Sequence, residues 1–177
     1  GAMLSVAGSG PEREALAALC VELDIVDGVI FRGRLDRDAM ADLYRSATVA
    51  INPSRVDNMP NSVLEAMASG IPVVSTNVGG VPCILREGIT GIMIDAGDHL
   101  AMAKAVQRIL ADLQLAARIR NAALGEVQQY SWPLVRHQWA ALYASAPPCP
   151  PGAVRAAWRA SRPPAGPWTG SQSRVSR

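Results

Sequence analysis

The 177-residue sequence contains only three cysteines, Cys20, Cys83 and Cys149, and no closely spaced pair of them. An odd number of widely separated cysteines predicts neither a disulfide framework nor a zinc site. We therefore expect free thiols and a cytoplasmic location.

Long apolar runs are also missing. No uninterrupted stretch approaches the roughly 18 to 20 residues that cross a bilayer, and no basic segment followed by an apolar one marks a secretory leader. The opening Gly1 to Met3 resembles the remnant of a cleaved tag.

Charged residues are few, 18% of the chain, and unevenly distributed. Residues 1–145 carry 12 basic and 15 acidic side chains, whereas residues 146–177 carry five arginines and no acid. Because a nucleic-acid-binding domain needs a basic face on the fold itself, the mildly acidic body argues against nucleic acid as a partner. With 49% hydrophobic residues, the chain has enough apolar material for one buried core, and two full domains do not fit.

Apolar segments typical of strands alternate with amphipathic segments typical of helices. The predicted strands are residues 4–7, 28–31, 48–52, 71–75 and 91–95. The predicted helices are residues 12–23, 37–46 and 61–69, a short helix before residue 91, and two or three helices between residues 98 and 143. The strand segments are continuous apolar runs, which indicates a parallel sheet covered by helices on both faces. The predicted fold class is therefore α/β.

The composition changes at residue 146, which predicts a folded domain over residues 4–145 and a disordered Pro- and Arg-rich tail over residues 146–177. Seven of the 13 prolines lie between residues 147 and 167. A second interpretation gives the arginines of this tail, with Trp158 and Trp168, a weak attraction to anionic lipid of about 1 kcal/mol per Arg. No apolar helical face organises these residues, which favours disorder.

The segment from Asn52 to Gly70 contains the candidate ligand-binding groups of the chain. A predicted strand ends, a loop carries Asp57, and a helix begins near Asn61 with Glu65 one turn in. Such a loop lies at the carboxyl edge of a parallel sheet, where ligands bind, and the free amides of a helix start suit a phosphate. Carboxylates beside a phosphate suit the hydroxyls of a sugar.

Several of the candidate residues also have an alternative interpretation. Ser62 and Glu65 have the spacing of a capping box, in which each side chain bonds to the backbone of the other residue. Gly8-x-Gly10 after a strand suggests dinucleotide binding, but Arg13 occupies the third glycine position of that fingerprint. Arg55 supplies a cation for a phosphate or is a surface residue.

Many separated motifs in the same order make residues 4–143 similar to the C-terminal, donor-binding domain of retaining GT-B glycosyltransferases with a Glu-x7-Glu motif, the group 1 type. The spacing of Asp57 and Glu65 matches that motif, and Pro53-Ser54 precede it. Glu65-Ala-Met-Ala-Ser-Gly-Ile-Pro and the Gly79-Gly80 turn follow it. The resemblance implies a Rossmann-like doubly wound parallel sheet, the C-terminal half of a GT-B fold, without its first strand.

The resemblance also implies a function. It predicts transfer of a hexose from a nucleoside-diphosphate sugar to an acceptor with retention of configuration, in polysaccharide or glycolipid synthesis, with no metal and no cofactor. Asp57 contacts hydroxyls of the transferred sugar and Glu65 those of the ribose, and these two are the candidate catalytic residues. The other implied donor-binding residues are Gly8, Gly33, Arg34, Met59, Pro60, Asn61, Ser62 and Val63.

The sequence departs from the family pattern at two residues. Asp57 stands where Glu is usual, and Cys83 where Glu is common. The family places another strand and helix, bearing an Arg and a Lys, and an acceptor domain upstream. The absent strand would lie between the strands at residues 4–7 and 48–52, and the two open edges invite self-association. The alternative is a truncated, inactive nucleotide-binding or assembly module. Contact with the inner face of a membrane stays open.

Overall fold

A computed structural model describes residues 1–145, and the predicted disorder of residues 146–177 lies outside the described residues. The chain divides into two compact units, Gly1–Ser131 and a second unit that begins at Trp132. The described part of the second unit is helix α7, Trp132–Ser145. Within residues 1–145, no helix is long and apolar enough to cross a membrane. The predicted boundary at residue 146 stays a prediction.

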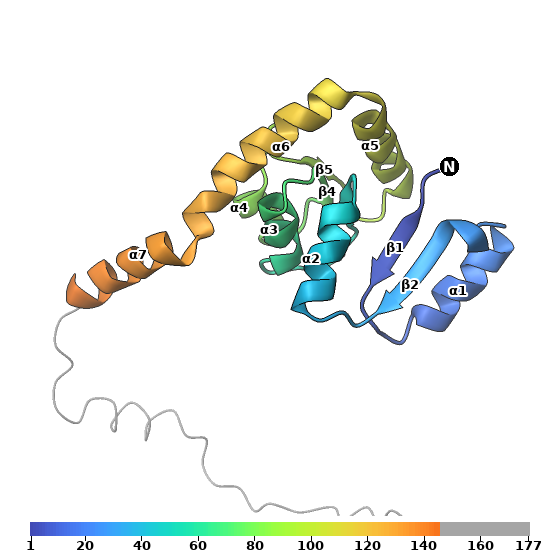
Figure 1. Cartoon of the computed structure of the whole chain (residues 1–177), viewed down its shortest axis with the longest axis horizontal. Coiled ribbons are helices and arrows are strands. Elements are labelled where there is room, and N and C mark those ends of the chain that lie inside the picture. Colours follow the sequence, from blue (N-terminus) through green and yellow to red (C-terminus); the bar gives the residue numbers. More distant parts are fainter. Residues whose placement is uncertain (146–177) are drawn as a thin grey trace, which may run out of the picture. The chain divides into compact units, whose positions relative to one another are not determined.

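The first unit alternates strands and helices as the sequence predicts, with bounds that differ by up to a few residues (Figure 1). The strands are β1 (Leu4–Ala7), β2 (Val29–Gly33), β3 (Ala50–Asn52), β4 (Val73–Thr76) and β5 (Ile92–Ile94). The α-helices are α1 (Arg13–Glu22), α2 (Arg37–Ser46), α3 (Asn61–Ala68), α4 (Val81–Ile84), α5 (His99–Ala111) and α6 (Leu113–Val127). Two short 3-10 helices are η1 (Val26–Gly28) and η2 (Gln128–Tyr130).

Several helices begin and end where local chemistry dictates. The carboxylates of Asp36, Asp98 and Asp112 each accept a hydrogen bond from the backbone three residues later, at 2.9, 2.8 and 2.9 Å, and start α2, α5 and α6. Gly70 ends α3 in the left-handed conformation, with φ of 72°, which a side chain would disfavour. The predicted stop at Gly70 is confirmed.

All strand pairs are parallel, which confirms the predicted α/β class. β3, β4 and β5 form one sheet in that order, with Ile51 beside Val74 and Val74 beside Ile92. The neighbours Val73 and Val74 of β4 face opposite sides of the sheet and are 1% and 0% exposed. Val73 belongs to a core cluster with α3, α4 and α6, and Val74 to a second cluster with α5 and α6. Helices therefore cover both faces of this sheet.

β1 pairs only with β2, and β3 only with β4, among the described residues, so their other edges are unpaired. Between β1 and β3 runs a groove of about 960 Å³ that both strands line, together with α2 and the start of α3. Leu4 and Ile51 are each 40% exposed at this groove. The predicted gap between the strands at residues 4–7 and 48–52 is thus present.

Burial on both faces does not extend to β1, β2 and β3, whose residues are half-buried or exposed. Helix α1 likewise buries none of its residues, and Leu16, Leu19 and Leu23, which have the spacing of one helical face, are 43%, 44% and 55% exposed. The apolar pattern correctly predicted the elements. The burial differs because β1 and β2 form a sheet of two strands and β3 is an edge strand of the other sheet, so each has fewer neighbours.

Candidate donor site at the carboxyl ends of β3 and β4

A loop of residues 53–60 leads from the carboxyl end of β3 into α3. Its start is held by a polar network with β4. The Asn52 side-chain amide donates to the Ser75 hydroxyl at 3.2 Å, and the Thr76 hydroxyl donates to the Ser54 carbonyl at 2.5 Å. Ser75 and Thr76 are 0% and 2% exposed, so these hydroxyls need the partners that they have. The strand end is therefore a fixed platform for the loop.

Asp57 is half-buried in this loop. The Ser54 hydroxyl donates to Asn52 Oδ1 at 2.8 Å and lies 3.4 Å from Asp57 Oδ2. The Asp57 carbonyl accepts a hydrogen bond from the Gly80 amide at 3.1 Å. The backbone of Asp57 is therefore tied to the turn that follows β4, while one carboxylate oxygen has a single long contact.

The Gly79-Gly80 turn packs directly on the loop of residues 53–60. A Cβ at Gly79 would lie 1.7 Å from the Asp57 carbonyl oxygen, and a Cβ at Gly80 would lie 1.7 Å from the Asn58 carbonyl oxygen. Real Cβ atoms essentially never approach within 3.0 Å of another heavy atom. The two glycines thus set the position of the Asp57 loop against β4, a role that the sequence pattern did not reveal.

Helix α3 begins with exposed, unpaired backbone donors. Pro60 precedes its first residue and caps it without a side-chain hydrogen bond. The Val63 amide donates to the Pro60 carbonyl at 3.1 Å, whereas no protein acceptor for the Asn61 or Ser62 amide occurs among the described residues. Asn61 and Ser62 are exposed and Val63 is 1% exposed. The helix start therefore offers two amides to an anion, and the third predicted amide is already used.

Glu65 has a partner that the sequence did not predict. The hydroxyl of Tyr44, on α2, lies 3.2 Å from Glu65 Oε2 and 3.2 Å from the Ser62 carbonyl oxygen. Burial of Tyr44, reinforced by the negative charge and the hydrogen bond of Glu65, raises the pKa of its hydroxyl well above the usual range. The hydroxyl therefore stays protonated and donates. Glu65 itself is exposed.

The capping-box interpretation of Ser62 and Glu65 is wrong. Because α3 begins at Asn61, Ser62 is its second residue and cannot cap it, and Glu65 bonds to Tyr44 instead. One signal did exist. Met40, Leu43 and Tyr44 share one face of the predicted helix at residues 37–46, and a buried tyrosine hydroxyl usually finds a hydrogen-bond partner.

Gly8 and Gly33 come together at the carboxyl ends of β1 and β2. The Gly8 amide donates to the Gly33 carbonyl at 2.7 Å, and no described atom lies within 4 Å of the place where either Cβ would be. Arg34 follows Gly33 and is exposed. The space beside both glycines is open, as the predicted donor contacts require.

The predicted site residues thus fall into two groups. Gly8, Gly33 and Arg34 follow the two-stranded sheet, and Asp57 through Glu65 follow the three-stranded sheet. Within the second group Met59 is 51% exposed and Pro60 is buried. No hydrogen bond between described residues joins the two groups. Arg55 is exposed, in agreement with its surface interpretation.

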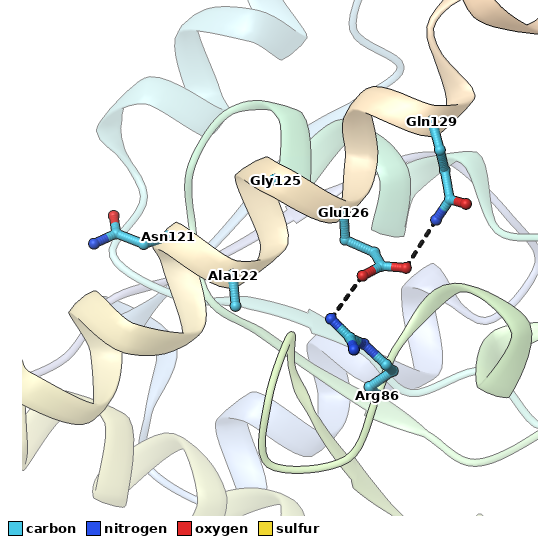
Figure 2. A pocket seen from close by; sticks show the side chains of 6 residues that line it. All are labelled: Arg86, Asn121, Ala122, Gly125, Glu126 and Gln129. Atoms are coloured by element: carbon cyan, nitrogen blue, oxygen red, sulfur yellow. Dashed lines mark hydrogen bonds and ion pairs between the residues drawn. The ribbon is translucent and has the colours of Figure 1, made fainter.

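Other features of the described residues lie apart from these groups. A shallow cavity of about 370 Å³ contains none of the predicted site residues (Figure 2). On its wall Arg86 pairs with Glu126 at 2.7 Å, and Gln129 donates to Glu126 at 2.8 Å, which ties the segment after α4 to α6. Over residues 1–145, no group of three or more His, Cys, Asp or Glu side chains is arranged to hold a metal ion.

Comparison with known proteins gives a consistent result. A family described as glycosyl transferases group 1 matches residues 1–112. An uncharacterized glycosyltransferase of Methanocaldococcus jannaschii is 37% identical over 132 residues, 74% of this chain and 34% of the relative. The D-inositol 3-phosphate glycosyltransferase of Acidothermus cellulolyticus is 36% identical over 121 residues, 68% of this chain and 27% of the relative. The chain therefore spans about a third of the length of these curated relatives.

Solved structures of GT-B glycosyltransferases share the architecture. Sucrose-phosphate synthase of Thermosynechococcus elongatus superposes with a TM-score of 0.73 at 30% identity, over 90% of this chain and 39% of that one. The Anabaena protein HepE, in complex with UDP-glucose, superposes with a TM-score of 0.75 at 20% identity, over 81% of this chain and 41% of that one. At that identity the HepE match shows the fold alone.

Proposed function

The chain belongs to the group 1 glycosyl transferases, and from this membership we propose that it forms the donor site of a retaining GT-B glycosyltransferase. The enzyme moves a hexose from a nucleoside diphosphate to an acceptor, in polysaccharide or glycolipid synthesis. The observation that carries the proposal is the start of α3. There the free amides of Asn61 and Ser62 lie within one helical turn of Glu65, whose carboxylate is held by Tyr44.

Each group at this helix start has a chemical counterpart in a nucleotide sugar. Amide N–H groups at a helix N-terminus bind phosphate oxygens, and the helix dipole adds about 0.3 to 2 kcal/mol. A carboxylate repels phosphate but accepts hydrogen bonds from hydroxyls. We therefore assign the diphosphate to the amides of Asn61 and Ser62, the ribose hydroxyls to Glu65, and the hydroxyls of the hexose to Asp57.

The two carboxylates act by positioning the donor. Neither is assigned as a general acid or base. In the proposed reaction the bond between the sugar carbon and the leaving diphosphate breaks, the acceptor oxygen bonds to that carbon, and the diphosphate takes up the acceptor proton. Binding of ribose and phosphates away from the reacting carbon orients the sugar for this step. No metal and no cofactor take part in this proposal.

The proposal includes partners outside this chain. The acceptor is held by an N-terminal domain, and residues 4–145 form the donor-binding domain. The cytoplasm is the proposed location, in keeping with the free thiols of Cys20 and Cys83, with weak contact at the inner face of the membrane.

Calorimetry tests the donor assignment. UDP and GDP, alone and as sugar conjugates, are titrated into the wild-type chain and into Glu65→Ala. Loss of hydrogen bonds to a charged group costs about 1.5 to 3 kcal/mol, so Glu65→Ala should weaken binding by about 10- to 100-fold. Glu22→Ala removes the same charge from an exposed position on α1 and serves as the control. Equal binding by wild type and Glu65→Ala would show that the ribose assignment is wrong.

A second candidate function is a nucleotide-binding or assembly module that is inactive by itself. The open groove between β1 and β3 favours it, because two unpaired strand edges are a surface for association. The two functions differ in transfer activity. Release of nucleoside diphosphate that depends on both sugar donor and acceptor supports the enzyme, and nucleotide binding without any such release supports the module.

A further inference from the structure

Glu65 is exposed, yet its carboxylate has a defined place. A glutamate side chain loses rotamer entropy when it is fixed in one conformation. A ribose-binding carboxylate that already points toward its ligand therefore binds more tightly than one that must be ordered on binding. The group that holds Glu65 Oε2 is the hydroxyl of Tyr44, at a distance of 3.2 Å. Tyr44 lies on α2, 21 residues before Glu65 in the sequence.

The Tyr44 hydroxyl also reaches the first turn of α3. It lies 3.2 Å from the Ser62 carbonyl oxygen, next to the amides assigned to the diphosphate. Both distances exceed the about 2.7 to 2.8 Å typical of an O–H···O bond, as expected when one proton is shared between two acceptors. A single hydroxyl thus joins α2 to the Glu65 carboxylate and to the first turn of α3.

The ring of Tyr44 fixes where this hydroxyl lies. The residue is 8% exposed and packs in the core cluster that contains Val63, Ala66 and Met67 of α3. Because the ring is packed in that core, the position of the hydroxyl is fixed. The hydroxyl therefore sets the position of the Glu65 carboxylate that accepts its hydrogen bond.

We infer that Tyr44 is a positioning residue for donor binding: its hydroxyl orients the Glu65 carboxylate toward the ribose. The inference rests on the proposed function, because it assigns Tyr44 an effect through Glu65. It adds a residue on α2 to the group of candidate site residues that otherwise come from the β3–α3 segment. The role assigned to Tyr44 involves no direct contact with the donor.

Tyr44→Phe tests the inference because it keeps the ring in the core and removes only the hydroxyl. Calorimetry compares UDP with its 2′,3′-dideoxy analogue, which lacks the ribose hydroxyls that Glu65 accepts. Tyr44→Phe should weaken the binding of UDP by about 3- to 10-fold and should change the affinity for the dideoxy analogue much less. In the Glu65→Ala background the same substitution should leave the affinity for UDP unchanged, since the group it orients is gone.

Tyr130→Phe is the matched control. The hydroxyl of Tyr130 donates to the Cys83 carbonyl at 3.0 Å, a tie between η2 and α4 that involves no proposed donor contact. Its loss should affect UDP and the dideoxy analogue equally. A purely structural role of Tyr44 would give the same equal effect on both ligands.

The outcomes separate this inference from the proposed function. If wild type does not prefer UDP over the dideoxy analogue, the ribose contact is wrong, and the inference falls with it. If wild type prefers UDP and Glu65→Ala loses that preference, but Tyr44→Phe keeps it in full, the proposed function stands and the inference about Tyr44 is overturned.

Discussion

Replacement of Gly80 by alanine should displace the loop that carries Asp57. The added Cβ would lie 1.7 Å from the Asn58 carbonyl oxygen and 2.9 Å from its carbon, where at least 3.0 Å from the oxygen is needed. Both neighbours are backbone, so no side chain can rotate to make room. The loop must move by about 1.3 Å, the difference between 3.0 and 1.7 Å.

The displacement has a cost in stability and a larger one in function. Overpacking of this kind costs about 1 to 3 kcal/mol, and for a chain of this size each kcal/mol lowers the melting temperature by about 2 to 4 °C. The hydrogen bond from the Gly80 amide to the Asp57 carbonyl, 3.1 Å long, is also strained or lost. A shift of about 1 Å in a positioning group can reduce turnover about 100-fold.

Two assays measure these effects. Thermal unfolding gives the stability change, and the NMR shifts of the backbone amides of residues 54–59 and 61–63 report the position of the loop. Gly125→Ala is the matched control, because Gly125 lies inside α6 with no atom within 4 Å of its Cβ position. It should stabilise the chain by about 1 kcal/mol through helix propensity. Gly80→Ala with the melting temperature of wild type and unshifted loop amides would refute the role of the turn.

Three further predictions concern the core, the tyrosines and the groove. Met67 is 0% exposed, so Met67→Ala should lower the free energy of unfolding by about 2 to 5 kcal/mol in urea, whereas Val56→Ala, at a residue 90% exposed, should change it by less than about 0.5 kcal/mol. Burial raises the pKa of Tyr44 and Tyr130 above the ordinary value of 10.0, so their contribution to stability is complete below that pH and is lost as the pH rises above it. Urea unfolding at about pH 8 and about pH 11 should show this loss, and it should be smaller in Tyr44→Phe; an equal loss in both proteins would argue against it. The open edges of β1 and β3 predict self-association, so light scattering after size exclusion should show a mass that grows with concentration. A monomer at every concentration would contradict that prediction.

Local patterns were sufficient to predict the elements of the fold. The continuous apolar runs identified all five strands, and Gly70 marked the end of α3, because strand burial and helix termination depend on residues close in the sequence. The apolar face of α1 stays exposed at Leu16 and Leu19, since an apolar helix face shows what a helix could bury and not how large a sheet lies opposite it.

The contacts that build the site depend on tertiary packing. Ser62 and Glu65 have the spacing of a capping box, but α3 starts two residues too early for that pairing, with Pro60 at its N-cap, and the partner of Glu65 comes from α2. The close approach of Gly80 to Asn58 joins segments 22 residues apart and has no local signature. The sequence identifies the candidate site residues, whereas the contacts that hold them in place arise from residues distant in the sequence.

The structure of the chain with a bound nucleotide sugar tests the central claim most directly. With UDP-glucose as the probe, we expect the Glu65 carboxylate within about 2.5 to 3.0 Å of a ribose hydroxyl and the diphosphate oxygens within about 2.7 to 3.2 Å of the Asn61 and Ser62 amides. A bound nucleotide whose ribose lies beyond hydrogen-bond reach of Glu65, or whose phosphates leave the start of α3 empty, would contradict the account.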